Sequence, residues 1–191
     1  MKNNSNSNNI LLLCQAALIA ALYIVLTFLA NAMGLANYAV QVRFSEALTI
    51  LPFFTPAAIP GLFVGCLLSN ILTGCALPDI VFGSLATLVA AILTYKFKKN
   101  KWLAPVFPIA ANAIVVPFVL LYCYGIEPLW FSFLTVTAGE IISCGILGML
   151  LLFTLQKHAG GCFPPSLISS VLTTTKENEK AGSQDMHEWS L

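Results

Sequence analysis

The stretch ILLLCQAALIAALYIVLTFLA, Ile10 to Ala30, contains no charged side chain. An apolar run of about 20 residues is long enough to cross the hydrocarbon core of a bilayer as an α-helix. The rest of the chain has the same character, because 58% of its 191 residues are hydrophobic and only 9% are charged. A soluble domain carries about 25% charged residues. The sequence therefore predicts an all-α integral membrane protein.

Glycine and proline divide the remaining sequence into further apolar spans. These cover residues 44–54, 57–73, 80–95, 102–124 and 129–155. With the first span they predict six transmembrane helices within a membrane domain of residues 10–158. We expect residues 1–9 to be a disordered polar leader and residues 159–191 a polar, mobile tail. A cleaved signal peptide is the alternative for the first span, but that span exceeds the about 7–15 residues of a secretory apolar region.

The basic residues indicate the orientation of these helices. Short cytoplasmic loops of membrane proteins collect lysine and arginine. With six helices, both termini and the loop Lys96–Lys101 lie on one side, together with every lysine of the chain. Only Arg43 lies on the other side. The distribution predicts that both termini are cytoplasmic and that Arg43 faces outward.

Acidic residues inside the predicted membrane domain are the next unusual feature, and Glu140 is the deepest of them. It comes about 16 Å into the last helix, near the middle of a hydrocarbon layer about 30 Å thick. A charge at that depth costs a few kcal/mol and usually marks a ligand site or a transport pathway. Asp79 and Glu127 lie near external helix ends, where solvation by water accounts for Glu127.

The segment VQVRFSEALTILPFF, Val40 to Phe54, places Arg43 and Glu46 on one face of a helix. One interpretation is a structural ion pair or an anchoring arginine, and the other is the rim of a binding pocket open to the outside. Asn112, midway along the fifth helix, either belongs to this pocket or joins two helices. The candidate substrate-binding residues are Arg43, Glu46, Asn70, Asp79, Asn112 and Glu140.

Small residues repeat along the first helix as Ala16-x-x-x-Ala20 and Ala17-x-x-x-Ala21. This spacing gives a smooth helix face and lets another backbone approach closely. The faces serve either internal contacts of the six-helix domain or the docking of a membrane partner. Both interpretations remain open.

The sequence lacks the motifs that mark several functional classes. The sequence contains no H-E-x-x-H, no G-x-S-x-G and no G-x-x-x-x-G-K-[ST]. Its cysteines are scattered without C-x-x-C spacing, so we predict neither a metal site nor a cofactor. No basic stripe interleaved with aromatics points to nucleic acid. We therefore expect a solute-binding transport subunit that is not an enzyme. A membrane-embedded enzyme and a self-sufficient permease are the rival classes.

The block RFSEALTILPFFTPAAIPG, Arg43 to Gly61, and the later run DIVFGSLATLVAAILTY, Asp79 to Tyr95, strongly resemble the QueT family. Members of this family are substrate-binding S-components of energy-coupling factor (ECF) transporters in bacterial plasma membranes. The resemblance extends over residues 10–157. It implies a six-helix fold with an external pocket, which works with a transmembrane coupling subunit and two ATPase subunits. The alanine faces of the first helix match the docking surface that S-components offer the coupling subunit.

The resemblance further implies that the ligand is a queuosine precursor, a deazaguanine base, released when the protein topples in the bilayer. A carboxylate of Glu140 or Glu46 would then accept hydrogen bonds from the guanine-like edge. Aromatic candidates for stacking on the ring are Phe44, Tyr38 and Trp130. The loop Asn31–Gln41 is the expected lid. Another vitamin or base remains an alternative, because the fold does not decide the ligand.

Overall fold

The computed structural model describes residues 3–35, 42–125 and 128–162, and these residues contain no β-strand. Their elements are α1 (Asn3–Ala32), η1 (Phe44–Phe53), α2 (Ala58–Leu72), η2 (Asp79–Gly83), α3 (Ser84–Lys96), η3 (Lys101–Leu103), α4 (Val106–Tyr124), α5 (Leu129–Glu140), η4 (Ile141–Gly148) and α6 (Met149–Cys162). Several elements follow one another without a break, so that η2 with α3, η3 with α4, and α5 with η4 and α6 form continuous helical runs. The predicted all-α fold is confirmed.

Among the described residues, four helical runs are long and apolar enough to cross a membrane. They are Asn9–Ala32, Asp79–Lys96, Lys101–Cys123 and Leu129–Lys157. The other two predicted spans form the shorter apolar helices Phe44–Phe53 and Ala58–Leu72. The first of these is a 3-10 helix with Pro52 inside it, and at about 2.0 Å per residue it rises only about 20 Å. The protein is therefore a multi-pass helical membrane protein with four candidate spans, and the six-span count stays a prediction.

The first helix starts earlier than predicted. α1 begins at Asn3 and not at Ile10, so the polar leader is helical from Asn3 onward. Adding turns to an existing helix avoids the cost of nucleation, and Asn and Ser side chains are favoured at helix starts. At the other end α6 continues to Cys162, past the predicted boundary at His158.

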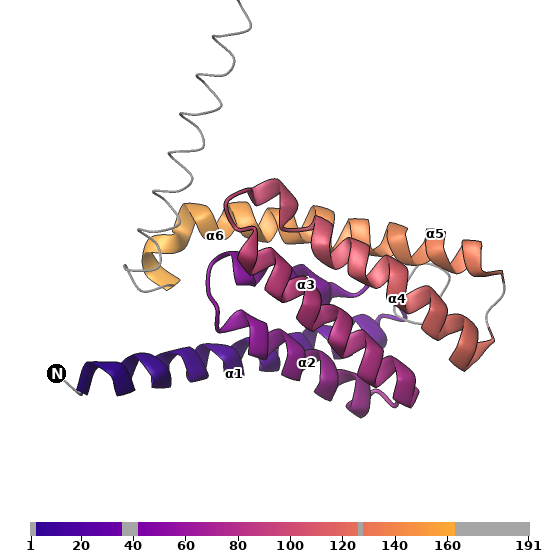
Figure 1. The fold of residues 1–191 in the computed structure, drawn as a ribbon, viewed down its shortest axis with the longest axis horizontal. Helices are drawn as coiled ribbons and strands as arrows, with labels where there is room; N and C mark the ends of the chain where they lie inside the picture. The colour runs from indigo at the N-terminus through magenta and orange to yellow at the C-terminus, as the bar shows by residue number, and fades with distance from the viewer. Residues whose placement is uncertain (1–2, 36–41, 126–127, 163–191) are drawn as a thin grey trace, which may run out of the picture.

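Figure 1 shows the helices running back and forth along the long axis of the molecule. The N-terminal end of α1, the connection between α3 and α4, and the C-terminal end of α6 lie toward one end, on the left. We call this the lysine end, because the connection carries Lys96 to Lys101. The end of α2, the end of α4 and the start of α5 lie toward the opposite end. Which of the two ends faces the cytoplasm stays a prediction.

The helix η1 occupies the middle of the bundle. It contacts α1, α2, α3, η4 and α6, and its residues from Ser45 to Phe53 are all buried. Gly148 of η4 allows a close approach on one side, since a Cβ there would lie 3.2 Å from Ile50 Cγ2. A helix that is apolar almost all round is stable only when other elements surround it. This enclosure carries Glu46 into the protein interior.

The backbone of α1 lies directly against α2. A Cβ on Gly61 would stand 2.7 Å from the Ala16 carbonyl oxygen, and one on Gly65 would stand 2.8 Å from Tyr23 Cβ and 3.1 Å from Ala20 Cα. Two rows of small residues thus face one another, as is common between membrane helices. Internal contact is therefore the role of the Ala16–Ala20 row in this structure.

The second alanine row of α1 points elsewhere. Ala17 and Ala21 are exposed, and no described part of the chain covers them. Of the predicted docking residues, Ala17 and Ala21 are therefore the exposed ones, whereas Ala16 is half-buried and Ala20 is buried.

Gly65→Ala tests the close contact between α1 and α2. The added methyl group meets Tyr23 at less than van der Waals distance, so we expect a loss of about 1–3 kcal/mol of stability and a lower apparent melting temperature in detergent. Gly145→Ala is the matched control, because its nearest neighbour would be Ile141 Cγ2 at 3.7 Å. Equal melting temperatures for the two variants would contradict the tight contact.

Candidate binding site

Two carboxylates from distant parts of the chain meet inside the bundle. Glu46 lies on η1 and Glu140 ends α5, and their side chains are 1% and 6% exposed. One oxygen of each carboxylate and the sulfur of Cys144 lie within 4.8 Å of one another. Acidic groups at such depth in an apolar protein need hydrogen-bond donors or a ligand.

Glu140 is held by its neighbours on α4 and η4. The side-chain amide Nδ2 of Asn112 donates to Glu140 Oε1 at 2.9 Å. The thiol of Cys144, one turn further along, donates to Glu140 Oε2 at 3.2 Å. Asn112 is itself buried. Asn112 therefore joins two helices and lies in the candidate site at the same time, so the two roles considered for it coincide.

Glu46 is only partly satisfied. The hydroxyl of Tyr23, on α1, donates to Glu46 Oε1. The other oxygen, Oε2, is buried and has no hydrogen-bond partner among the described residues. An ionised carboxylate accepts several hydrogen bonds, and a buried acceptor without a donor costs about 1–3 kcal/mol or more. Glu46 Oε2 is thus an open acceptor within the site.

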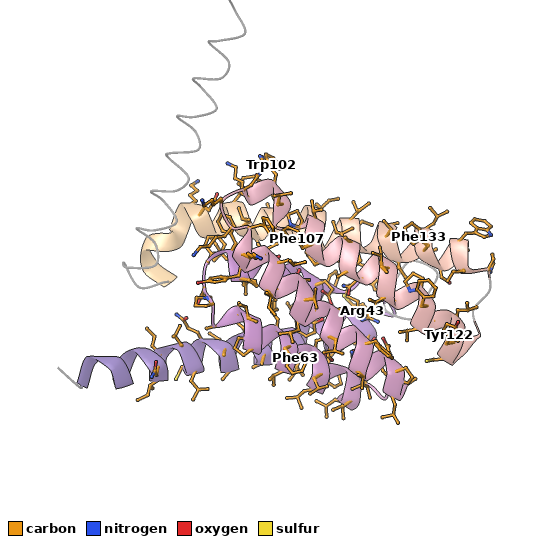
Figure 2. All side chains as sticks on the ribbon, viewed as in Figure 1. Arg43, Phe63, Trp102, Phe107, Tyr122 and Phe133 are labelled. Atoms are coloured by element: carbon orange, nitrogen blue, oxygen red, sulfur yellow. The ribbon has the colours of Figure 1, made fainter. Side chains whose placement is uncertain are left out.

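Arg43 and Asp79 lie near these carboxylates. Arg43 precedes η1 and is half-buried, and it lies close enough to Asp79 and Glu46 to interact with both electrostatically. Figure 2 places Arg43 in the body of the bundle, well away from Trp102 at the lysine end. Asp79 Oδ1 is a second buried oxygen without a partner in the described part of the chain.

Asn70 lies beside Asp79. A Cβ on Gly83 would stand 3.4 Å from Asn70 Nδ2 and also 3.4 Å from Asp79 Oδ1. The amide of Asn70 also donates to Cys66 Sγ at 3.6 Å. The structure therefore gathers the six residues predicted from the sequence in one interior region. Their role in ligand binding stays a prediction.

The backbone departs from regular α-helical geometry at Asp79 and directly after Glu140. The π-helix η2 begins at Asp79, and the π-helix η4 begins directly after Glu140. π-helical turns are rare and often coincide with functional sites. Along α5 and η4 the buried face carries Ser132, Val136, Glu140 and Cys144 at every fourth position, and Ser132 Oγ is another polar atom without a described partner.

Two residues of the site were missed at the sequence level. Tyr23 is a phenol within an apolar span, where a buried hydroxyl needs a partner. Cys144 lies one turn after Glu140 and therefore shares its face. Both signals were present in the sequence, but neither identifies Glu46 as the neighbouring residue.

The aromatic candidates have different outcomes. Phe44 is half-buried beside Arg43. Trp130 is 65% exposed and lies edge-to-face with Phe131 at the surface, so the structure does not place it in the site. Tyr38, Glu127 and residues 36–41 of the expected lid lie outside the described residues.

Polar groups toward the lysine end bond to one another. Thr55 Oγ1 donates to Gln15 Oε1 at 3.1 Å, and Thr94 Oγ1 donates to the Ala104 carbonyl at 3.3 Å. Glu46 Oε2 and Asp79 Oδ1, in contrast, have no partner among the described residues. The other buried side-chain oxygens without a described partner, Ser45 Oγ, Ser132 Oγ and Ser143 Oγ, lie on η1, α5 and η4, the elements that carry or directly follow the two glutamates.

Comparison with known proteins adds a family match. A model described as QueT transporter matches residues 13–157. A protein of Lactococcus lactis subsp. cremoris (strain MG1363), described as queuosine precursor transporter QueT, is 33% identical over 88 residues, which are 44% of this chain and 52% of that protein. The chain thus spans about half the length of that curated relative. No solved structure matches the chain significantly.

Proposed function

Because the chain belongs to the QueT transporter family, we propose that it binds a queuosine precursor, a deazaguanine base, at the site around Glu46 and Glu140. The resemblance predicted from the Arg43–Gly61 block is confirmed by the match over residues 13–157. The relative from Lactococcus lactis is described as a queuosine precursor transporter.

The observation that carries the proposal is the pair of open acceptors, Glu46 Oε2 and Asp79 Oδ1. A guanine-like edge presents adjacent N–H donors, which suit a carboxylate acceptor. Hydrogen bonds to charged groups contribute about 1.5–3 kcal/mol each. The bound base supplies the donors that the protein lacks at these oxygens.

The neighbouring groups complete the recognition of the base. Glu140 retains acceptor capacity beyond its bonds to Asn112 and Cys144, because a carboxylate has about four lone-pair sites. Asn70 offers an amide beside Asp79, and the half-buried ring of Phe44 is suited to stack on the heterocycle. Arg43 balances part of the acidic charge.

We assign the chain to the ECF importers as their S-component, with six membrane helices and both termini cytoplasmic. It contains no P-loop sequence, so the energy for accumulating the base would come from two ATPase subunits through a transmembrane coupling subunit. The exposed Ala17–Ala21 row of α1 is the proposed docking face. Toppling in a bacterial plasma membrane would then release the base inside.

A self-sufficient permease is the competing transport function. The self-paired polar groups toward the lysine end favour the S-component, because a permease needs a polar path through both halves of the membrane. Uptake of radiolabelled base into vesicles that contain only this chain decides between them. Uptake without the coupling and ATPase subunits would reject the S-component mechanism.

The ligand itself is tested with purified protein and a panel of deazaguanines, flavin, thiamine and other bases. A ligand that binds the folded state adds about 2.7 kcal/mol to the free energy of unfolding at 100 times its Kd, and so raises the apparent melting temperature. We expect deazaguanines alone to produce the shift. A shift with an unrelated vitamin and none with deazaguanines would overturn the substrate assignment.

Tyr23→Phe removes the donor to Glu46 and keeps the Cβ atom that lies against Gly65. The carboxylate then loses its orienting bond, which is worth about 1.5–3 kcal/mol, so we expect the affinity for the base to fall about 10- to 100-fold. Calorimetric titration measures the change, and Tyr95→Phe at the lysine end is the control. Unchanged affinity in Tyr23→Phe would remove Tyr23 from the positioning of Glu46.

A further inference from the structure

We infer that Glu46, Glu140 and Cys144 form a site for a soft divalent cation such as Zn²⁺, and that this ion excludes the base from the same carboxylates. The three side chains come from η1, α5 and η4, and all are buried. One ligand atom of each lies within 4.8 Å of the other two. Only the competition with the base rests on the proposed function.

The hydrogen bonds leave a convergent set of ligand atoms. The hydroxyl of Tyr23 donates to Oε1 of Glu46, and the amide of Asn112 donates to Oε1 of Glu140. Glu46 Oε2, which has no described partner, and Glu140 Oε2, which accepts only from the Cys144 thiol, are the remaining carboxylate oxygens. Carboxylate ligands of metal ions are commonly fixed by outer hydrogen bonds of this kind. The bonds from Tyr23 and Asn112 supply that support.

The distances suit a tetrahedral ion after a small movement. Cys144 Sγ and Glu140 Oε2 are 3.2 Å apart, whereas ligands at Zn–S about 2.3 Å and Zn–O about 2.0–2.2 Å stand about 3.5 Å apart. The third ligand lies at most 4.8 Å away. The Glu46 oxygen would therefore have to move by up to about 1.3 Å to reach tetrahedral spacing.

Charge and ligand softness decide the kind of ion. Two carboxylates this close in an apolar interior repel one another when both are ionised, and a divalent cation between them removes that repulsion. A thiolate ligand selects Zn²⁺ or Cd²⁺ over Mg²⁺ and Ca²⁺, which prefer oxygen. The Cys144 thiol gives up its proton when it binds the ion.

The test uses the purified full chain, stripped with a chelator and titrated with Cd²⁺ and then Zn²⁺. We expect a thiolate-to-cadmium absorption band, calorimetric Zn²⁺ binding and no binding of Mg²⁺ or Ca²⁺. Cys144→Ser should lose the band and at least about tenfold in Zn²⁺ affinity. Cys14→Ser, at an exposed cysteine of α1, is the matched control and should keep both. A band that persists in Cys144→Ser overturns the site.

A second variant distinguishes loss of the ion site from loss of the fold. Zn²⁺ should raise the apparent melting temperature of the wild type, and Glu140→Gln should keep a cooperative transition that Zn²⁺ no longer shifts. A full Zn²⁺ shift in folded Glu140→Gln rejects the ion site.

Competition between the ligands separates this inference from the proposed function. Saturating deazaguanine should raise the apparent Kd for Cd²⁺, and simultaneous binding overturns the exclusion. If Zn²⁺ binds and no deazaguanine does, the ion site stands and the proposed function fails. If the base binds and Zn²⁺ does not, the proposed function stands and the inference fails.

Discussion

Glu140→Gln lowers the affinity for the deazaguanine base by at least about 100-fold, which corresponds to about 2.8 kcal/mol. The amide that replaces the carboxylate has a single acceptor oxygen and no charge, so it cannot serve Asn112 and a ligand donor with equal strength. One or two charge-assisted hydrogen bonds are lost, each worth about 1.5–3 kcal/mol. Isothermal titration calorimetry in detergent measures the difference.

The chain should stay folded in this variant, because removing a charge from the middle of an apolar bundle lowers the cost of burial. The melting temperature without ligand checks that point. Thr137→Val is a matched control one turn earlier, since its hydroxyl bonds only to the Phe133 carbonyl of the same helix. If Glu140→Gln and Thr137→Val bind the base equally well, Glu140 has a structural role alone.

The helical spans could be predicted from the sequence because each is bounded by residues that end helices. The span predicted over residues 57–73 is helical from Ala58 to Leu72, and Gly125 ends α4 with a left-handed backbone at φ 63°. The hydrophobic pattern does not distinguish helix types, however. The 3-10 geometry of η1 and the π-helical turns at Asp79 and after Glu140 depend on contacts with neighbouring helices.

Most residues of the candidate site could be predicted from the sequence, but the contacts between them could not. Glu140 stood out because a charge at that depth is costly, and the structure brings Asn112 to it. The partner of Glu46 was not predictable, because the helical period gives the face of a residue and not the helix opposite. Tyr23 therefore reaches Glu46 through the contact of α1 with η1, which no local pattern encodes.

The same limit explains the alanine rows of α1. Both rows have the spacing that favours close helix contact, yet only one faces α2. Gly61 and Gly65 complement the Ala16–Ala20 row because the missing side chains admit the α1 backbone. Ala17 and Ala21 remain at the surface. A spacing rule finds both rows, and only the three-dimensional arrangement separates the internal row from the candidate docking row.

Replacing both Ala17 and Ala21 with tryptophan should abolish stable assembly with the coupling and ATPase subunits. Association of membrane helices depends on close backbone approach between small residues, and two indole rings on an exposed helix face hold a partner helix several ångströms away. We expect at least about a tenfold loss of co-purified coupling subunit, equal to about 1.4 kcal/mol. Uptake of the base should fall in parallel.

Binding of the base by the isolated double variant is the internal check, because Ala17 and Ala21 do not contact the carboxylate site and should leave its affinity intact. Ala110→Trp and Ala138→Trp, at exposed positions of α4 and α5, are matched controls that add the same bulk to other faces. Assembly lost in all of these variants would indicate a general effect of bulk in the bilayer. If the Ala17 and Ala21 double variant still assembles, the docking face does not lie on this row of α1.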